Sequence, residues 1–205
     1  MESIFWPLID NGMKLVRSCY SKSMFQLGIS GVLNGSRIVF ESFSHPDPCA
    51  TMNLAAESFL DSGCDRMVVI DSDHDFQPAD IARLLSHDLP LVSGLYSKKT
   101  VDLEWPVMPI GDESPEVLFA DDAPSPVEVR CVPRGFISIH KSVFETLMPH
   151  VEVDQGLHFF FRSLPGIASE DFTFCDLYRK HGGKVWLDHK IRVFHEGSCM
   201  YPIKK

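Results

Sequence analysis

The chain has 205 residues, of which 44% are hydrophobic and 23% are charged. This composition is typical of one soluble globular domain, and the length is sufficient for a full hydrophobic core. Acidic residues outnumber lysine and arginine by 28 to 19, which gives a net charge of −9. That charge argues against a nucleic-acid-binding surface, because phosphate contacts need clustered cations. An anionic ligand would need a metal ion or a local group of cations.

The cysteines show neither a C-x-x-C pair nor the spacing of zinc ligands. They are Cys19, Cys49, Cys64, Cys131, Cys175 and Cys199. We expect them to be reduced, mostly as core thiols. The N-terminus lacks the pattern of a signal peptide, and no apolar stretch approaches the roughly 20 residues of a membrane-spanning helix. The expected compartment is therefore the reducing cytoplasm.

The first elements are only weakly patterned. Residues 4–8 predict a short strand that is interrupted by Pro7. A helix follows over residues 13–27, with Gly28 as its expected stop. Residues 37–43 then predict a second strand.

A better-defined helix begins at Pro48. Asp47 is a candidate N-cap, and proline is favoured at the first helical position. The helix is expected to end at Gly63. Its apolar residues recur every three or four positions, which predicts one face packed on a sheet. These residues are Met52, Ala55, Ala56, Phe59 and Leu60.

The central stretch of the chain runs from an apolar strand directly into acids. Residues 67–70 are Met-Val-Val-Ile, and Asp71, Asp73 and Asp75 follow at alternate positions. If the extended geometry persisted, alternation would place the three carboxylates on one side, where they could bind a hard divalent cation. A strand that ends in a polar turn explains the same acids, since Asp bonds nearby backbone amides. The stretch alone leaves both interpretations open.

Pro78 opens a further helix that closes near His87, and a strand follows over residues 89–95. The alternation of strands and helices predicts parallel pairing with right-handed crossovers. Ligands in such sheets bind at the carboxyl ends of the strands. Asp71 and Lys98 both lie at such ends.

The second half begins with a long acidic segment over residues 100–125, and loops of this length are usually functional or mobile. The elements expected after it are strands over residues 127–132 and 135–139, helices over 141–148 and 170–181, and strands over 184–188 and 191–195.

Two further positions could carry chemistry. Ser169, Glu170 and Asp171 begin the last long helix, where acids are favoured by the helix dipole and Ser is an ordinary N-cap. One of these carboxylates could instead act as a general base that removes a proton from a hydroxyl. His195 ends an apolar strand; it is either structural or a partner of carboxylates around Mn²⁺.

Taken together, residues from about 45 to 200 resemble the GT-A family of nucleotide-sugar-dependent glycosyltransferases, particularly its small bacterial and viral members. The segments that carry the resemblance are Ile70-Asp71-Ser72-Asp73 as the D-x-D segment, Val92 to Lys99 as the next strand and basic turn, Arg134 to Ile139 as the glycine loop, Ser169 to Cys175 as the acidic motif, and His195-Glu196-Gly197 as the C-terminal metal-binding histidine.

The resemblance implies an open α/β sheet of mixed, mainly parallel direction, with helices on both faces. It implies one catalytic domain over residues 1–205. Residues up to about 100 would bind the nucleotide sugar, and residues from 101 onward would supply the acceptor and catalytic part.

The resemblance also implies roles for single residues. Asp73 would bind Mn²⁺ or Mg²⁺ with His195, and Asp71 would contact the metal shell or the ribose. Lys98 would offset phosphate charge. The backbone around Gly135 could approach the donor sugar closely because no Cβ intervenes.

The N-terminal third departs from the family pattern. The family usually has a Pro-Thr-Tyr-like turn that contacts the nucleotide base, whereas this chain has Pro7-Leu8-Ile9-Asp10. Asp10 would substitute for that contact.

The implied reaction moves a sugar from a nucleotide-diphosphate donor to a hydroxyl of a glycan or another acceptor. Asp171 would be the general base, with Glu170 as its neighbour or substitute, and the anomeric configuration would be inverted. Retaining enzymes share the fold, so the stereochemistry stays open.

Two other functions also remain open. One is a nucleotidyltransferase that makes sugar nucleotides, although these usually carry a glycine-rich phosphate loop near the N-terminus, and residues 28–35 match it poorly. The other is a non-catalytic nucleotide-sugar-binding module, as one part of a larger polypeptide or complex.

Overall fold

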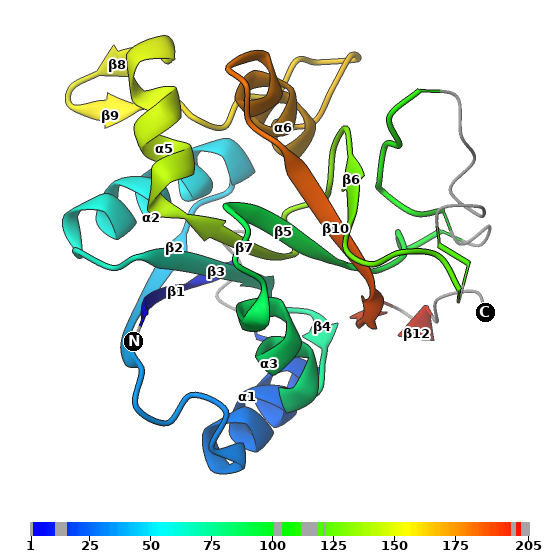
Figure 1. Cartoon of the computed structure of the whole chain (residues 1–205). Helices are drawn as coiled ribbons and strands as arrows, with labels where there is room; N and C mark the ends of the chain where they lie inside the picture. Colours follow the sequence, from blue (N-terminus) through cyan, green and yellow to red (C-terminus); the bar gives the residue numbers. More distant parts are fainter. Residues whose placement is uncertain are drawn as a thin grey trace.

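A seven-stranded mixed sheet forms the centre of the fold (Figure 1). The computed structural model describes residues 2–10, 16–100, 104–111, 119–120, 122–197 and 200–201, without the side chains of residues 10, 200 and 201. The strand order is β2-β1-β3-β7-β5-β10-β6. The strands are β1 (Ser3–Asp10), β2 (Arg37–Ser44), β3 (Arg66–Asp71), β5 (Leu91–Leu95), β6 (Val127–Val129), β7 (Phe136–His140) and β10 (Val185–Arg192).

Both strand directions occur in this sheet. β1 pairs in parallel with β2 and β3, and β10 pairs in parallel with β5. β7 lies between β3 and β5 and is antiparallel to both, and β6 is antiparallel to β10. The predicted open sheet of mixed direction is confirmed. Because β7 and β10 come from the second half of the chain, both halves contribute strands to one sheet.

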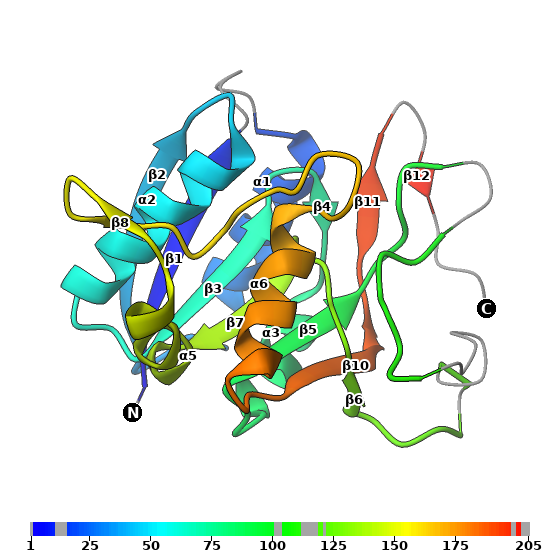
Figure 2. The ribbon, with the colours of Figure 1, turned by 90° about the horizontal axis from the view of Figure 1, so that it is seen from above.

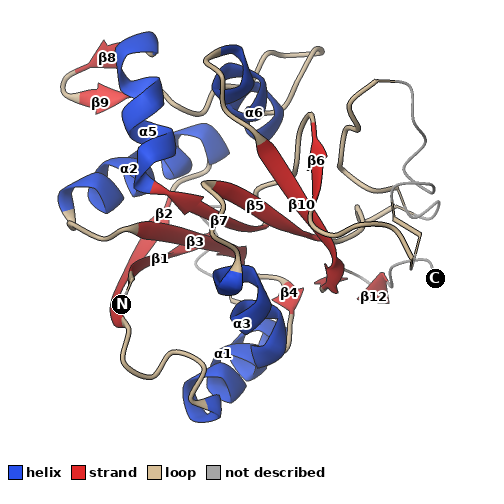
Figure 3. Ribbon diagram, viewed as in Figure 1, coloured by secondary structure: helices blue, strands red, loops and turns tan. Residues whose placement is uncertain are grey.

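Helices cover both faces of the sheet (Figure 3). On one face lie α2 (Pro48–Asp61), α5 (Lys141–Leu147) and α6 (Glu170–Lys180); Figure 2 has α2 and α6 in front of the strands. On the other face lie α1 (Ser18–Ser30) and α3 (Pro78–Ser86). None of the helices in the described part of the chain combines the length and the apolar character needed to cross a membrane.

The two faces bury two separate hydrophobic clusters. Phe59, Phe144 and Phe174 are fully buried between the sheet and the helices α2, α5 and α6. Leu27 and Ile81 are buried on the side of α1 and α3. Burying one such side chain stabilises the fold by roughly 1.5–3 kcal/mol, so the predicted apolar helix faces account for the layering.

Small strands complete the structure. A 3₁₀ turn (Met148–His150) follows α5 and leads to the hairpin of β8 (Val153–Asp154) and β9 (Leu157–His158). A three-stranded sheet at the carboxyl end of β3 consists of β4 (His74–Asp75), β11 (Phe194–Glu196) and β12 (Met200–Tyr201).

Two predicted boundaries in the N-terminal part are wrong. β1 continues through Pro7 because its ladder with β2 is unbroken, while its register with β3 skips from Phe5 to Leu8. A proline can occupy this gap since it donates no hydrogen bond. α1 does not stop at Gly28; it ends at Gly31, whose φ of 77° is the left-handed conformation that glycine adopts easily.

The last two predicted strands are also divided differently. Residues 185–192 form the single strand β10, with a register irregularity between Asp188 and Arg192. The chain then leaves the main sheet as β11, which pairs with β4 and β12. The boundary lies where the chain changes from one partner strand to another, and the local sequence does not encode this change.

A fully buried carboxylate ties β10 to α3. Asp188 Oδ2 lies 2.5 Å from Arg83 Nε and 2.7 Å from His87 Nε2, and Oδ1 accepts a hydrogen bond of 2.5 Å from the Ser125 hydroxyl. Burial alone would raise the pKa of Asp188, but the hydrogen bonds from Arg83, Ser125 and His87 outweigh it and lower the pKa to about 2. The ionised form is therefore strongly favoured in the folded protein.

Replacing Asp188 by Asn should destabilise the fold by on the order of 2–3 kcal/mol at neutral pH, because it removes hydrogen bonds to a charged group. Urea unfolding measures this loss. The folded pKa is below the unfolded value of about 4, so the contribution is complete above about pH 4 and disappears as the pH falls towards 2. The gap between wild type and D188N should close over that window.

Asp176→Asn is the matched control, since Asp176 pairs with Arg130 at an exposed position on α6. Exposed ion pairs contribute about 0–1 kcal/mol. Equal losses in the two variants, or a D188N effect that does not change with pH, would contradict this account of Asp188.

Candidate functional site

The three acids of the central stretch do not share one side. β3 ends at Asp71, whose N–H donates to the carbonyl of Gly135 at 2.9 Å, and the backbone then turns before β4 begins. Asp75 accepts a hydrogen bond of 2.9 Å from the hydroxyl of Ser23 in α1. The predicted common side is wrong because the extended geometry stops at Asp71, and only Asp71 and Asp73 stay together.

His74, instead of Asp75, is the third member of the cluster with Asp71 and Asp73. Ligand atoms of Asp71, Asp73 and His74 lie within 4.8 Å of one another. β11 brings in a second imidazole, since its register places His195 opposite His74. His195 Nε2 lies 3.3 Å from Asp73 Oδ1, and the two rings stack with centroids 4.6 Å apart. Two carboxylates and two imidazoles therefore meet at the carboxyl end of β3.

The two rings have different surroundings. Complete burial lowers the pKa of His74 to about 4, so this ring is neutral at physiological pH. Neither of its nitrogens has a hydrogen-bond partner among the described residues. His195 Nδ1 lies 3.1 Å from the carbonyl of Ser97, which can only accept a hydrogen bond, so Nδ1 carries a proton and Nε2 faces Asp73.

The two oxygens of Asp73 have different surroundings. Oδ2 contacts the ammonium of Lys99. Oδ1 is buried and accepts no hydrogen bond from the described residues. Burial alone would raise the pKa of Asp73, but His195 and Lys99 outweigh it and hold the pKa well below its usual range. An ionised, buried oxygen that faces imidazole nitrogens is unfavourable unless a cation satisfies it.

Gly135 makes the close approach of these groups possible. Its N–H donates to the hydroxyl of Tyr96 at 3.0 Å. A Cβ at this position would lie 2.6 Å from the Tyr96 oxygen and 2.8 Å from both Asp71 Oδ2 and His74 Cε1. Any side chain here would therefore displace members of the cluster.

Arg134 connects the cluster to the start of α6. Its Nη1 donates to Asp71 Oδ1 at 2.8 Å, and its Nε donates to Glu170 Oε1 at 3.2 Å. Burial alone would lower the pKa of Arg134, but Asp71 and Glu170 raise it above the usual value. The guanidinium is thus permanently charged, and its two partners could not be predicted from the sequence.

The two acids at the start of α6 are held differently. Glu170 pairs with Arg134, whereas Asp171 accepts hydrogen bonds from its neighbour's N–H (Phe172, 3.1 Å) and from the Ser169 hydroxyl. Ser169 occupies the N-cap position, but its side chain binds Asp171 instead of capping the helix. Burial raises the pKa of Asp171 in spite of the hydrogen bond from Ser169. Burial raises the pKa of Tyr96, and the charges of Asp71 and Asp171 raise it further.

The remaining predicted residues lie at or beyond the edge of this cluster. Lys98 pairs with Glu104 at 2.9 Å on the surface, and its neighbour Lys99 is the lysine that contacts Asp73. β1 ends at Asp10, whose side chain lies outside the described residues. The sequence indicated a basic turn but not which of two consecutive lysines points inward. The sequence pattern also did not identify His74 as a site residue, although this histidine lies among the three acids.

The sequence matches no family model and no curated protein. Solved structures do match over the whole chain. A197 from STIV is 15% identical with a TM-score of 0.58, and 95% of its chain is covered. GalNAc-T7, solved with UDP, GalNAc and Mn²⁺, is 12% identical with a TM-score of 0.53, and this chain spans only 44% of its length. At such identities the likeness concerns the fold alone, and the fold of this chain is GT-A-like.

Proposed function

We propose that this protein is a metal-dependent glycosyltransferase that moves a sugar from a nucleotide-diphosphate donor to an acceptor hydroxyl. The observation that carries the proposal is the cluster of Asp71, Asp73, His74 and His195 at the carboxyl end of β3 in a GT-A-like sheet. Ligands bind at this edge in open α/β sheets. The presence of UDP and Mn²⁺ in the structure of GalNAc-T7, which has a similar fold, supports the same assignment.

The residues present fit a divalent cation. Asp73 Oδ1 and His195 Nε2 are the first candidates as ligands, because the oxygen lacks a hydrogen-bond donor and the nitrogen is oriented by the Ser97 carbonyl. Backbone carbonyls commonly orient metal-binding histidines in this way. Asp71 and the buried His74 complete the set. Carboxylates with imidazole suit Mn²⁺ better than Mg²⁺. When bound, such a cation neutralises the donor diphosphate and the charge that develops on the leaving nucleotide.

Cationic side chains would assist at the donor phosphates. We assign this role to Lys99 together with Lys98. Lys99 already contacts Asp73, and Lys98 is the residue before it in the turn. Arg134 donates to Asp71 at 2.8 Å and orients its carboxylate. Residues up to about 100 would bind the nucleotide, with Asp10 at the end of β1 near the base, and Gly135 would allow the sugar to approach the backbone.

Asp171 is the better general base of the two acids in the first turn of α6. Its raised pKa increases its affinity for a proton, which a base at physiological pH needs. Glu170 is a weaker candidate because its charge is already paired with Arg134. Asp171 would remove the proton of the acceptor hydroxyl as the hydroxyl attacks the anomeric carbon. Direct attack inverts the configuration at that carbon.

Asp73→Asn should weaken Mn²⁺ binding by at least about tenfold, because it replaces a charged ligand by a neutral amide. Titration of Mn²⁺ followed by electron paramagnetic resonance measures the free ion directly. Asp75→Asn is the matched control, since the Asp75 carboxylate binds Ser23 in α1. If Asp73→Asn and His195→Ala both keep the Mn²⁺ dependence of donor turnover, the metal site lies elsewhere.

Gly135→Ala should destabilise the fold by roughly 1–3 kcal/mol, because its Cβ overlaps with Tyr96, Asp71 and His74. Mn²⁺ affinity should fall with it. Gly28→Ala is the control: no heavy atom lies within 4 Å of its Cβ position, and Ala in this helix should stabilise by up to about 1 kcal/mol. Urea unfolding and the same Mn²⁺ titration measure both variants, and similar behaviour of the two would contradict the close-packed site.

Asp171→Asn should lower the turnover number for transfer by about 10²–10⁴-fold without weakening donor binding. Glu170→Gln, in the same helical turn, should have a smaller effect. Steady-state kinetics and a thermal-shift titration with the donor separate the two quantities. A protein that is stabilised by nucleotide sugars but neither transfers nor hydrolyses them would be a binding module, contrary to the proposal.

A further inference from the structure

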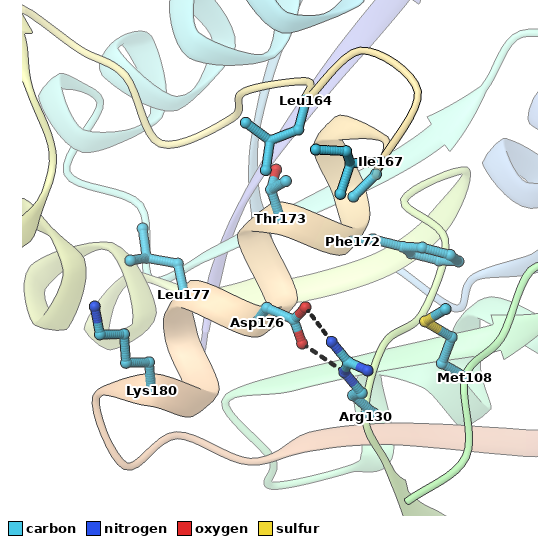
Figure 4. A pocket seen from close by; sticks show the side chains of 10 residues that line it. Met108, Arg130, Leu164, Ile167, Phe172, Thr173, Asp176, Leu177 and Lys180 are labelled. Atoms are coloured by element: carbon cyan, nitrogen blue, oxygen red, sulfur yellow. Dashed lines mark hydrogen bonds and ion pairs between the residues drawn. The ribbon is translucent and has the colours of Figure 1, made fainter.

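An apolar groove runs along the outer side of α6, beside the candidate site (Figure 4). Its volume is about 370 Å³, within the usual range of small-molecule sites. We call it the α6 groove. The apolar side chains that line it are Met108, Leu164, Ile167, Phe172 and Leu177.

The polar groups of the α6 groove are already engaged with the protein. Arg130 donates two hydrogen bonds to Asp176, of 2.9 and 2.8 Å, across the floor in Figure 4. The Thr173 hydroxyl donates to the carbonyl of Glu170 at 3.0 Å. Lys180 lies at the end of the groove that is remote from the start of α6. A ligand along the groove therefore meets mainly apolar surface.

The rim of the groove exposes apolar side chains on a rigid loop. Ile167 is 83% exposed and Leu164 is 47% exposed. The loop is closed by two hydrogen bonds between the backbones of Leu164 and Ala168, of 2.9 and 3.0 Å. Exposed apolar side chains that gather around a concave site often mark a binding site.

The groove adjoins the start of α6, which also carries Glu170 and Asp171. Phe172, which lines the groove, donates its N–H to Asp171. Ser163, directly before the exposed loop, donates to Glu170 Oε2 at 3.4 Å. Met108, on the opposite wall, lies four residues after Glu104, whose carbonyl accepts a hydrogen bond of 2.8 Å from the N–H of Lys98 in the basic turn. Two chain segments thus serve both the groove and the site.

We propose that the α6 groove binds an alkyl chain of the acceptor, attached close to the hydroxyl that reacts. This inference rests on the proposed function. The acceptor oxygen forms its bond to the anomeric carbon, the bond from that carbon to the diphosphate oxygen breaks, and Asp171 takes the hydroxyl proton. The acceptor is then an amphiphile, because a free sugar would leave the groove unfilled.

Binding can be tested without a donor. Octyl glycosides below their micelle concentration are titrated by calorimetry, each against the methyl glycoside of the same sugar. Each buried methylene strengthens binding by about fourfold, so octyl compounds should bind much more tightly than methyl ones. Ile167→Ser should lower octyl affinity by about tenfold. Ile29→Ser, a control at an equally exposed isoleucine on α1, should not change it.

Transfer from the preferred donor separates the two proposals. The Michaelis constant for the octyl acceptor should rise by about tenfold in Ile167→Ser, with donor hydrolysis and the constant for the methyl acceptor unchanged. If octyl and methyl acceptors behave alike, or Ile29→Ser has the same effect as Ile167→Ser, the groove proposal fails while the proposed function stands. If the wild type neither hydrolyses nor transfers any donor with Mn²⁺, both fail.

Discussion

The pairing of β4 with β11 is the constraint on which the candidate site depends. It places His195 opposite His74, and the N–H of Glu196 fixes the register by donating to the carbonyl of Asp73 at 2.8 Å. A slip of one residue would turn His195 to the other face of the strand and away from Asp73. The neighbouring hydrogen bond from Val193 to the carbonyl of Leu95 ties the same segment to the main sheet. The geometry of the candidate site therefore depends on this short ladder.

The charges around that ladder favour a cation. The carboxylates of Asp71, Asp73 and Glu170 face the two cations Lys99 and Arg134, so these five groups carry an excess of negative charge. Lys99 already contacts one oxygen of Asp73, and Arg134 contacts one oxygen of Asp71. The other oxygen of Asp73, Oδ1, faces imidazole nitrogens and accepts no hydrogen bond from the described residues. A divalent ion would satisfy all of these atoms together, which no single side-chain rotation can do.

Features that depend on neighbouring residues were predictable from the sequence, and features that depend on distant ones were not. Asp47 and Pro48 begin α2 as expected, because a side-chain cap and a fixed φ act within one turn. Acids after an apolar strand indicated the correct edge of the sheet. The sequence could not place His74 in the cluster, because that requires the turn after Asp71. It could not distinguish Lys99 from Lys98, nor anticipate that β7 would insert between β3 and β5.

The division of labour between Glu170 and Asp171 illustrates why the chemistry of the site needs the fold. The two acids are adjacent in one helical turn, and any local pattern treats them alike. Arg134, 36 positions earlier, reaches Glu170 and pairs with its carboxylate, while Asp171 accepts from neutral hydrogen-bond donors and has a raised pKa. The same first turn contributes Phe172 to the α6 groove. The proposed base, Asp171, therefore lies in one helical turn with Glu170, which pairs with Arg134, and with Phe172, which lines the α6 groove.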